Sequence, residues 1–283
     1  MGADTHPDQE RIDAVLEALH TLRAQDAGPL SQGLGASNAR RCLDLACEAI
    51  TTSGLQTALA TPGARPSDIT LVCASGVFTA PLEWAALYAA AGCRLDIKAP
   101  AQAPRFCQAL ALALSGQGLP THCSTDRRLG TPEVIVAFGD DDSVQAIATE
   151  NPDSRHVLYG HRFSVAAVQG EPTRALAEAL VEDHTLYDTR GCMAPTAVFV
   201  NGSIDPWVET LALAMDQAQA NHPRGSFDPS LGPEWRRRTG LARIRGVVFC
   251  EEASHGTPTV RFRGVLALGV QPPQPASCRG GQL

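Results

Sequence analysis

The residue with the clearest chemical potential is Cys192, which lies in the segment GCMAP at residues 191–195. Gly191 allows a close approach of the backbone, and Pro195 starts the following predicted strand rigidly. A nucleophilic cysteine is typically held on such a loop, where backbone N–H groups of a rigid scaffold can bind an oxyanion. A free cysteine is more often an inert buried thiol, and position alone leaves that alternative open.

Lys98 is the second candidate, because it is the only lysine among the 23 basic residues of the chain. A chain that otherwise uses arginine can keep a lysine where a compact ammonium on a flexible stem is needed. Lys98 follows the predicted strand Arg94–Ile97, and ligands of open α/β sheets bind at the carboxyl ends of the strands. A solvated lysine at the end of a strand explains the position equally well.

Gly139 and Asp140 begin a predicted helix directly after a strand, in the segment FGDDDS. A glycine at such a helix start lets backbone N–H donors reach a diphosphate. The three aspartates of this segment equally suit a helix cap, and they would repel a phosphate if they pointed at it. A purely structural capping turn therefore remains an alternative.

Three histidines precede Cys192 in the sequence: His156, His161 and His184. A Cys/His pair can activate a thiol, and we take His161 as the candidate catalytic partner. The alternative is that these histidines are surface or hydrogen-bonded loop residues. The spacing of these histidines and cysteines does not match a metal-ligand pattern, so no metal site is expected.

The elements that must position these residues indicate an α/β fold. Between residues 69 and 149, apolar strands alternate with helical segments, which is typical of βαβ units in a parallel sheet with helices on both faces. The predicted strands there are Ile69–Ala74, Arg94–Ile97 and Glu133–Phe138, and the predicted helices are Pro81–Ala91, Gln102–Leu114 and Asp140–Thr149. Two helices precede them, one within the first thirty residues and one that Ser37 caps and that runs to Ile50.

Shorter elements follow residue 155 and predict a smaller α/β domain. The predicted strands are Val157–Tyr159, Phe163–Val168, Ala197–Val200, Gly246–Cys250 and Thr259–Ala267, and the predicted helices are Ala175–Asp183 and Pro206–Gln219. We therefore predict a helical segment at 1–60, a dinucleotide-binding domain at 61–155, a catalytic domain at 156–268 and a disordered tail at 269–283.

Composition and charge exclude several classes of protein. The net charge of −7 argues against nucleic acid as a partner, and no apolar run approaches the ~18–20 residues that span a bilayer. The polar N-terminus lacks a hydrophobic signal region, and the nine cysteines include no C-x-x-C pair. These features favour a reduced, cytoplasmic protein.

Several segments together resemble the aldehyde dehydrogenase superfamily, and in particular its acyl-CoA reductase branch, typified by the fatty-acid reductase of bacterial bioluminescence. The most specific match is the run VIVAFGDDDSVQAI, HVLYGHRFSVAAV and LVEDHTLYDTRGCMAPTAVFV within residues 134–200. The stretch SGVFTAPLEWAALYAAAGCRLDIKAPAQAP at residues 75–104 is similar to the cofactor region of the superfamily.

The resemblance implies a Rossmann-like sheet, a catalytic domain and a role for each matching residue. Cys192 would attack an acyl-CoA or carrier-bound thioester, and hydride from a nicotinamide cofactor would reduce the acyl-enzyme to an aldehyde. Lys98 matches the lysine that binds the adenosine ribose, and Gly139 and Asp140 match the helix start that faces the pyrophosphate. The resemblance also implies a possible homo-oligomer.

Three departures from the family pattern bear on the chemistry. Ala101 stands where the superfamily has a glutamate for the ribose, which favours NADP, with NAD also possible. Gly76, grouped with the cofactor-binding candidates, stands where an oxyanion-binding asparagine is expected, so the backbone N–H of Cys192 is left as donor. No glutamate occurs at Tyr159–His161, where the family's hydrolytic base falls, and this disfavours oxidation of an aldehyde to an acid.

The region after Cys192 is shorter than the family normally carries, so we expect an abridged catalytic domain. The alternative to a reductase is therefore a catalytically impaired protein that keeps the fold and acts as a binding or scaffold subunit.

Overall fold

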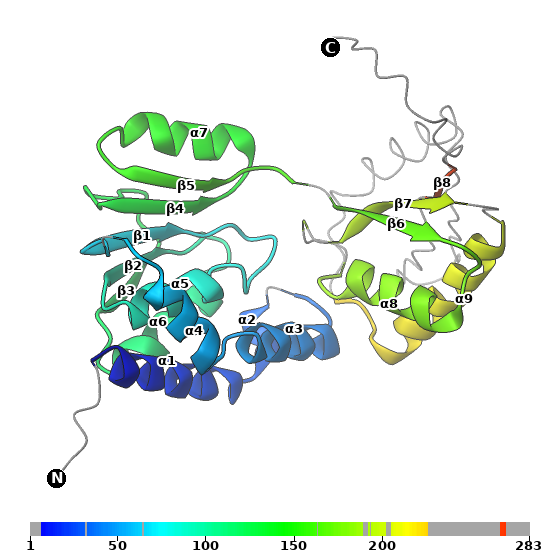
Figure 1. The fold of residues 1–283 in the computed structure, drawn as a ribbon, viewed down its shortest axis with the longest axis horizontal. Coiled ribbons are helices and arrows are strands. Elements are labelled where there is room, and N and C mark those ends of the chain that lie inside the picture. The colour runs from blue at the N-terminus through cyan, green and yellow to red at the C-terminus, as the bar shows by residue number, and fades with distance from the viewer. Residues whose placement is uncertain are drawn as a thin grey trace. The chain divides into compact units, whose positions relative to one another are not determined.

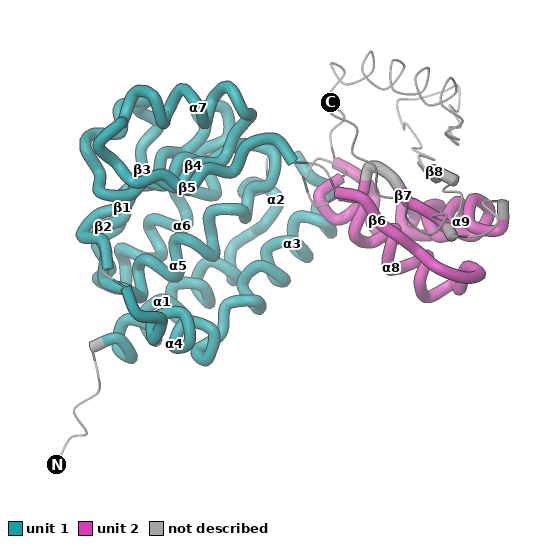
Figure 2. Tube along the Cα trace, turned by 45° about the horizontal axis from the view of Figure 1, so that its top comes forward, with its two compact units in different colours: residues 1–162, 190–192 teal, residues 163–189, 193–283 magenta. Residues whose placement is uncertain are grey.

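The computed structural model describes residues 7–31, 33–63, 65–162, 164–188, 192, 194–201, 205–225 and 267–269. The chain divides into two compact units (Figure 2). Unit 1 comprises residues 1–162 and 190–192, and unit 2 comprises residues 163–189 and 193–283. The predicted division into cofactor-binding and catalytic domains stays a prediction.

Unit 1 is built on a five-stranded parallel sheet with the strand order β3-β2-β1-β4-β5. Its strands are β1 (Asp68–Val72), β2 (Arg94–Lys98), β3 (Thr121–Ser124), β4 (Val134–Phe138) and β5 (Arg155–Tyr159). Leu71 of the central strand pairs with Ile97 of β2 and with Val136 of β4, and all three side chains are fully buried. Continuous apolar strands of this kind are buried on both faces of a sheet, which explains why they could be recognised in the sequence.

Helices cover both faces of this sheet. Helices α5 (Leu82–Ala90) and α6 (Arg105–Gly116) lead from β1 to β2 and from β2 to β3, whereas α7 (Asp141–Glu150) leads from β4 to β5. The chain moves outward from β1 in one direction and from β4 in the other, so right-handed crossovers place α7 on the face opposite α5 and α6. The predicted α/β class, with a parallel sheet covered on both faces, is confirmed.

The N-terminal helices of unit 1 pack beside α5 and α6 (Figure 1). They are α1 (Pro7–Arg23), α2 (Ala27–Leu30), α3 (Ala36–Glu48) and α4 (Thr52–Ala60). Ile12, Val15, Leu19 and Leu22 of α1 are buried, as their helical spacing predicts. Ser37 is not the predicted cap, because α3 begins at Ala36 and its N-cap is Gly35, which makes no side-chain bond.

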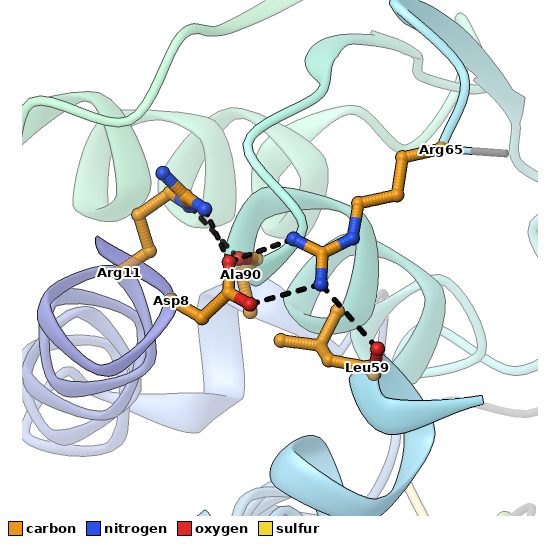
Figure 3. A network of polar contacts seen from close by, with 5 residues as sticks. All are labelled: Asp8, Arg11, Leu59, Arg65 and Ala90. Atoms are coloured by element: carbon orange, nitrogen blue, oxygen red, sulfur yellow. Dashed lines mark hydrogen bonds and ion pairs between the residues drawn. The ribbon is translucent and has the colours of Figure 1, made fainter. Parts of the chain in front are cut away.

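A polar network ties the start of α1 to two distant parts of unit 1 (Figure 3). The carboxylate of Asp8 accepts hydrogen bonds from the Arg65 guanidinium at 2.7 and 2.9 Å and another from Arg11. The Nε atom of Arg11 donates to the carbonyl of Ala90 at 3.0 Å, at the C-terminal end of α5. The hydrogen bonds from Arg65 and Arg11 hold the pKa of Asp8 well below its usual range.

Unit 2 has a three-stranded parallel sheet with the order β6-β7-β8, formed by β6 (Ser164–Gln169), β7 (Pro195–Asn201) and β8 (Ala267–Gly269). Helices α8 (Arg174–Thr185) and α9 (Asp205–Asn221) pack against each other. Trp207 is almost fully buried in the core of this unit, and its indole N–H donates to the carbonyl of Gly170 at 3.0 Å.

Three elements of unit 1 lack a clear signal in the sequence, and the first is α2, whose four residues AGPL include a glycine and a proline. Strand β3 is the short polar segment THCS at the edge of the sheet, and α4 contains threonines and a glycine. The predicted strand Gly246–Cys250, residues 259–266 of another and nearly all of the predicted tail lie outside the described residues.

Candidate active site

The carboxyl edge of the unit 1 sheet gathers most of the residues that the sequence singled out. Gly76 follows β1, Lys98 ends β2, Gly139 and Asp140 follow β4, and His161 follows β5. Because all neighbouring strands are parallel, these positions lie at the same edge of the sheet. The strand order reverses between β1 and β4, which is where open α/β sheets bind ligands.

Lys98 is held in place by two side chains. Its Nζ atom lies 2.8 Å from Oδ2 of Asp96 and 3.0 Å from Oγ of Ser124, and the side chain is only 11% exposed. The other carboxylate oxygen of Asp96 lies 3.2 Å from Nδ1 of His122. Lys98 is therefore a partly buried, oriented ammonium and not a solvated lysine at the end of a strand.

At the start of α7, the backbone N–H groups of Gly139 and Ser143 already have acceptors within the chain. Asp140 is the N-cap, and its carboxylate accepts the N–H of Ser143 at 2.7 Å, a hydrogen bond that lowers the pKa of Asp140. The N–H of Gly139 donates to the carbonyl of Tyr159 at 3.1 Å. The structure thus has the capping turn that the sequence left as an alternative, and the donor expected from Gly139 is already used.

The loop after β5 is packed tightly against the same helix start. The backbone N–H of His161 donates to Oδ1 of Asp141 at 2.7 Å, while the His161 side chain is exposed. A Cβ atom built on Gly160 would lie 2.1 Å from that Asp141 oxygen, so only glycine fits without displacing the carboxylate. Sequence reasoning missed both Gly160 and Asp141, although the glycine directly after a strand was a signal of close approach.

Aromatic side chains line the end of β4 and β5, and sequence reasoning missed these as well. The rings of Phe138 and Tyr159 stack with centroids 5.0 Å apart, and Trp84 of α5 lies 6.0 Å from Tyr159. The guanidinium of Arg162 lies 5.5 Å from the centroid of the Tyr159 ring. These partly exposed rings cluster beside the carboxyl edge of the sheet, with Trp84 tilted by 55° against Tyr159.

Cys192 is the accessible thiol of the described chain. Of the cysteines described, it is the exposed one; Cys123 is partly buried, and the remaining five, Cys42, Cys47, Cys73, Cys93 and Cys107, are buried. Burial raises the pKa of Cys123 to about 11, which suppresses its thiolate. Cys192 is therefore not buried, and its catalytic role stays a prediction. The neighbouring Gly191 and Met193 lie outside the described residues.

Two further candidate positions lack functional side chains, as the departures from the family pattern imply. Gly76 is exposed in the loop after β1, and Ala101 is exposed after β2. Among the described residues, no cluster of His, Cys, Asp and Glu could hold a metal ion. No helix in the described part of the chain has the length and apolar character required to cross a membrane.

Part of the chain is similar in sequence to a known protein family. Residues 126–252 match the family of acyl-CoA reductase (LuxC). The resemblance to the acyl-CoA reductase branch of the aldehyde dehydrogenase superfamily is confirmed. The LuxC match contains Gly139, Asp140, His161 and Cys192, whereas Gly76 and Lys98 precede it. No curated protein matches the chain in sequence.

Solved structures share the aldehyde dehydrogenase fold at low sequence identity. A NAD-dependent benzaldehyde dehydrogenase from Corynebacterium glutamicum has a TM-score of 0.68 and 17% identity, covering 93% of this chain and 66% of that one. An NADP-dependent enzyme from E. coli has a TM-score of 0.74 and 14% identity, covering 94% and 69%. An oxidoreductase from Marinobacter aquaeolei has a TM-score of 0.73 and 13% identity, covering 90% and 62%. The chain thus spans 62–69% of the length of these three structures.

Proposed function

We propose that this chain reduces an acyl thioester, either acyl-CoA or a carrier-bound thioester, to an aldehyde through a Cys192 acyl-enzyme, with NADPH as reductant. The observation that carries the proposal is the exposure of Cys192 within the region that matches the acyl-CoA reductase family. The wider proposal places this reaction in the cytoplasm and allows a homo-oligomer.

The Cys192 thiolate would attack the carbonyl carbon of the thioester. A new C–S bond forms to Cys192, the C–S bond to CoA or the carrier breaks, and the leaving thiolate takes up a proton from solvent or from His161. The backbone N–H of Cys192 would bind the oxyanion, because Gly76 has no side-chain donor. A bound nicotinamide would supply the hydride that reduces the acyl group. The thiolate of Cys192 is then regenerated as the aldehyde departs.

Lys98 would hold the adenosine ribose of the cofactor. Its ammonium is already oriented by Asp96 and Ser124, so little side-chain freedom is lost on binding. Ala101 presents no carboxylate to repel a 2′-phosphate, which favours NADP, while NAD stays possible.

The start of α7 does not fit the pyrophosphate of that cofactor. Asp140 already caps the helix, and Asp141 accepts the N–H of His161. Together with Asp142, these residues place three carboxylates in the first turn or at its cap, where they would repel a phosphate. The proposal therefore assigns the ribose to Lys98 and assigns no pyrophosphate contact to Gly139 or Asp140.

The decisive experiment measures aldehyde formation from acyl-CoA and NADPH. Cys192→Ala should lower the rate at least about 10³-fold, because the variant lacks the thiol on which the proposed acyl-enzyme forms. Cys123→Ala removes a partly buried thiol and serves as the matched control, with a rate close to that of the unmodified chain. Full turnover by Cys192→Ala would refute the acyl-enzyme.

A second candidate function is a catalytically impaired binding or scaffold subunit. The carboxylates at the start of α7 favour it, because they oppose a bound diphosphate. Titration with NADPH, followed by calorimetry, separates the two functions. Absence of binding together with a Cys192 that takes no acyl group would favour the scaffold, whereas binding and acylation would exclude it.

A further inference from the structure

Four polar side chains form two cross-strand pairs on one face of the unit 1 sheet. In the parallel register Asp96 lies opposite His122, and Lys98 lies opposite Ser124. Residues two apart on a strand share a face, so all four side chains lie on the same side of β2 and β3. Nζ of Lys98 contacts Asp96 at 2.8 Å and Ser124 at 3.0 Å, and the second oxygen of Asp96 lies 3.2 Å from Nδ1 of His122. The four side chains therefore form one connected polar group.

This polar group lies on the face of the sheet that carries α7 (Figure 1). Val72, the partner of Lys98 on β1, packs against the apolar cluster between the sheet and α7. Residues 125–133, all of which the structure describes, lead from β3 to β4 without a helix, so no crossover helix covers β2 and β3 on this face. The Asp96 side chain is 31% exposed and that of Lys98 only 11%. A ligand that reaches the ammonium therefore also meets the carboxylate.

Both charged groups keep hydrogen-bonding capacity for a ligand. An ammonium has three protons, and Asp96 and Ser124 accept two of those of Lys98, so one N–H remains. An ionised carboxylate has roughly four acceptor positions, and Lys98 and His122 occupy two of those of Asp96. One donor and one acceptor are thus offered side by side. This arrangement suits a hydroxyl group, because a hydroxyl can accept from the ammonium and donate to the carboxylate.

A phosphate would interact with the same two groups differently. It can accept from the remaining N–H of Lys98, but as a dianion it has no proton to donate to Asp96, and the two negative charges repel each other. The negative charge of Asp96 also offsets the positive charge of Lys98 at 2.8 Å. The pair therefore attracts an anion less strongly than an ammonium alone would.

We propose that Asp96 determines the selectivity of the Lys98 site between the 2′-phosphate of NADPH and the 2′-hydroxyl of NADH. Asp96 favours the hydroxyl and weakens the binding of the phosphate, and His122 holds its carboxylate in place. This inference rests on the proposed function, which puts the adenosine ribose at Lys98. Ala101 brings no carboxylate to that ribose, whereas Asp96 does, so the two residues act in opposite directions and the site accepts both cofactors.

The test compares the dissociation constants of NADPH and NADH, measured by calorimetry at pH 8, where a phosphate monoester is a dianion. The two cofactors differ only in the 2′-phosphate, so the ratio of the constants isolates its contribution. Asp96→Asn keeps an oxygen that can accept from Nζ and removes the charge. We expect it to raise the affinity for NADPH about tenfold and to leave that for NADH within about threefold.

Asp153→Asn is the matched control, because it removes the same charge from an exposed aspartate just before β5, at the opposite edge of the sheet. The ratio of the two dissociation constants should then stay within about twofold of that of the unmodified chain. Circular dichroism establishes that each variant is folded. If Asp96→Asn does not fold, Asp96→Thr carries the test, because threonine is neutral, has a hydroxyl acceptor and suits a strand.

Each outcome decides a different question. If both cofactors bind and Asp96→Asn leaves the ratio unchanged, the selectivity role is wrong while the proposed function stands. If both affinities fall together, Asp96 only orients Lys98, and the selectivity role is again overturned. An equal change in Asp153→Asn would assign the effect to the net charge of the chain and not to Asp96. If the unmodified chain binds neither cofactor, the proposed function fails and the inference fails with it.

Discussion

Lys98 and Ser124 meet across β2 and β3, with 3.0 Å between the Nζ and Oγ atoms. Asp96, two residues before Lys98 on the same strand, lies on the other side of the ammonium at 2.8 Å. The flexible Lys98 side chain is thereby fixed at the carboxyl edge of the sheet, the edge at which open α/β sheets generally bind ligands. Because the group is already oriented, a ligand anion or hydroxyl would meet it at little entropic cost.

Replacing Lys98 with glutamine should weaken the binding of NADPH about tenfold, which corresponds to about 1.4 kcal/mol. The reason is the loss of a charge-assisted hydrogen bond to the ribose or its phosphate. Titration followed by NADPH fluorescence measures the change. Arg94→Gln, at the amino end of the same strand, is the control and should bind as the unmodified chain does. Equal affinity of Lys98→Gln would remove Lys98 from the cofactor site.

The sequence contains enough information to predict the sheet and the edge at which its candidates gather. Continuous apolar strands such as Val134–Phe138 need no partner to be recognised, and parallel pairing then places Lys98 and Gly139 at one edge. What the sequence could not show is which hydrogen bonds those groups make. Whether the N–H of Gly139 faces a ligand or the carbonyl of Tyr159 depends on how far the pairing of β4 with β5 continues past Phe138.

Contacts between segments far apart in the chain were beyond sequence reasoning for the same reason. Nothing in the sequence distinguishes Asp188 from the other aspartates. Its burial and its hydrogen bond with the backbone N–H of Gly225 are visible only in the structure. Strand β3 carries no apolar run, because it lies at the edge of the sheet and pairs only with β2. A periodic pattern of apolar residues indicates which side chains are buried. A polar edge strand such as β3, or a single buried carboxylate such as that of Asp188, leaves no such pattern.

Alkylation of the folded chain should be selective at pH 8. The exposed Cys192 should be labelled first, because only about one Cys123 thiol in 10³ is ionised three units below a pKa of about 11. Because burial raises the pKa of Cys123 to about 11, its thiolate is scarce at pH 8 and becomes abundant only at higher pH. We expect labelling of Cys123 to accelerate nearly tenfold per pH unit between pH 8 and 10, as measured by mass spectrometry. Labelling of Cys123 ahead of Cys192 at pH 8 would contradict this order.

Asp8→Asn should destabilise unit 1 by about 1 kcal/mol at pH 7, because both Arg11 and Arg65 lose an ionised partner. The pKa of Asp8 is lower in the folded chain than in the unfolded one, so its contribution is present above the ordinary pKa of 3.8 and is lost as the pH falls through the folded value. Urea unfolding at pH 7 and at pH 3 measures this difference. The difference in the free energy of unfolding between the unmodified chain and Asp8→Asn should narrow at pH 3. A difference that widens on acidification would refute the lowered pKa of Asp8.

Gly160 and Asp141 provide a test of how tightly the loop after β5 packs on α7. Gly160→Ala should destabilise the chain by about 1–2 kcal/mol, because the new Cβ would lie 2.1 Å from Oδ1 of Asp141 and would displace the carboxylate from the N–H of His161. In the background of Asp141→Ala that oxygen is gone, and the nearest remaining atom among those around the new Cβ, Cα of Asp141 at 3.7 Å, is in ordinary contact.

The two substitutions should therefore be non-additive, with Gly160→Ala costing less than about 0.5 kcal/mol when Asp141 is already alanine. Urea unfolding of the four proteins of the cycle gives the interaction energy. Asp142→Ala is the matched control, because this neighbouring aspartate is not among the three atoms nearest the new Cβ, and the cost of Gly160→Ala in its background should be unchanged. Additive costs in the Asp141 cycle would show that the strain arises from the backbone of the loop and not from the carboxylate.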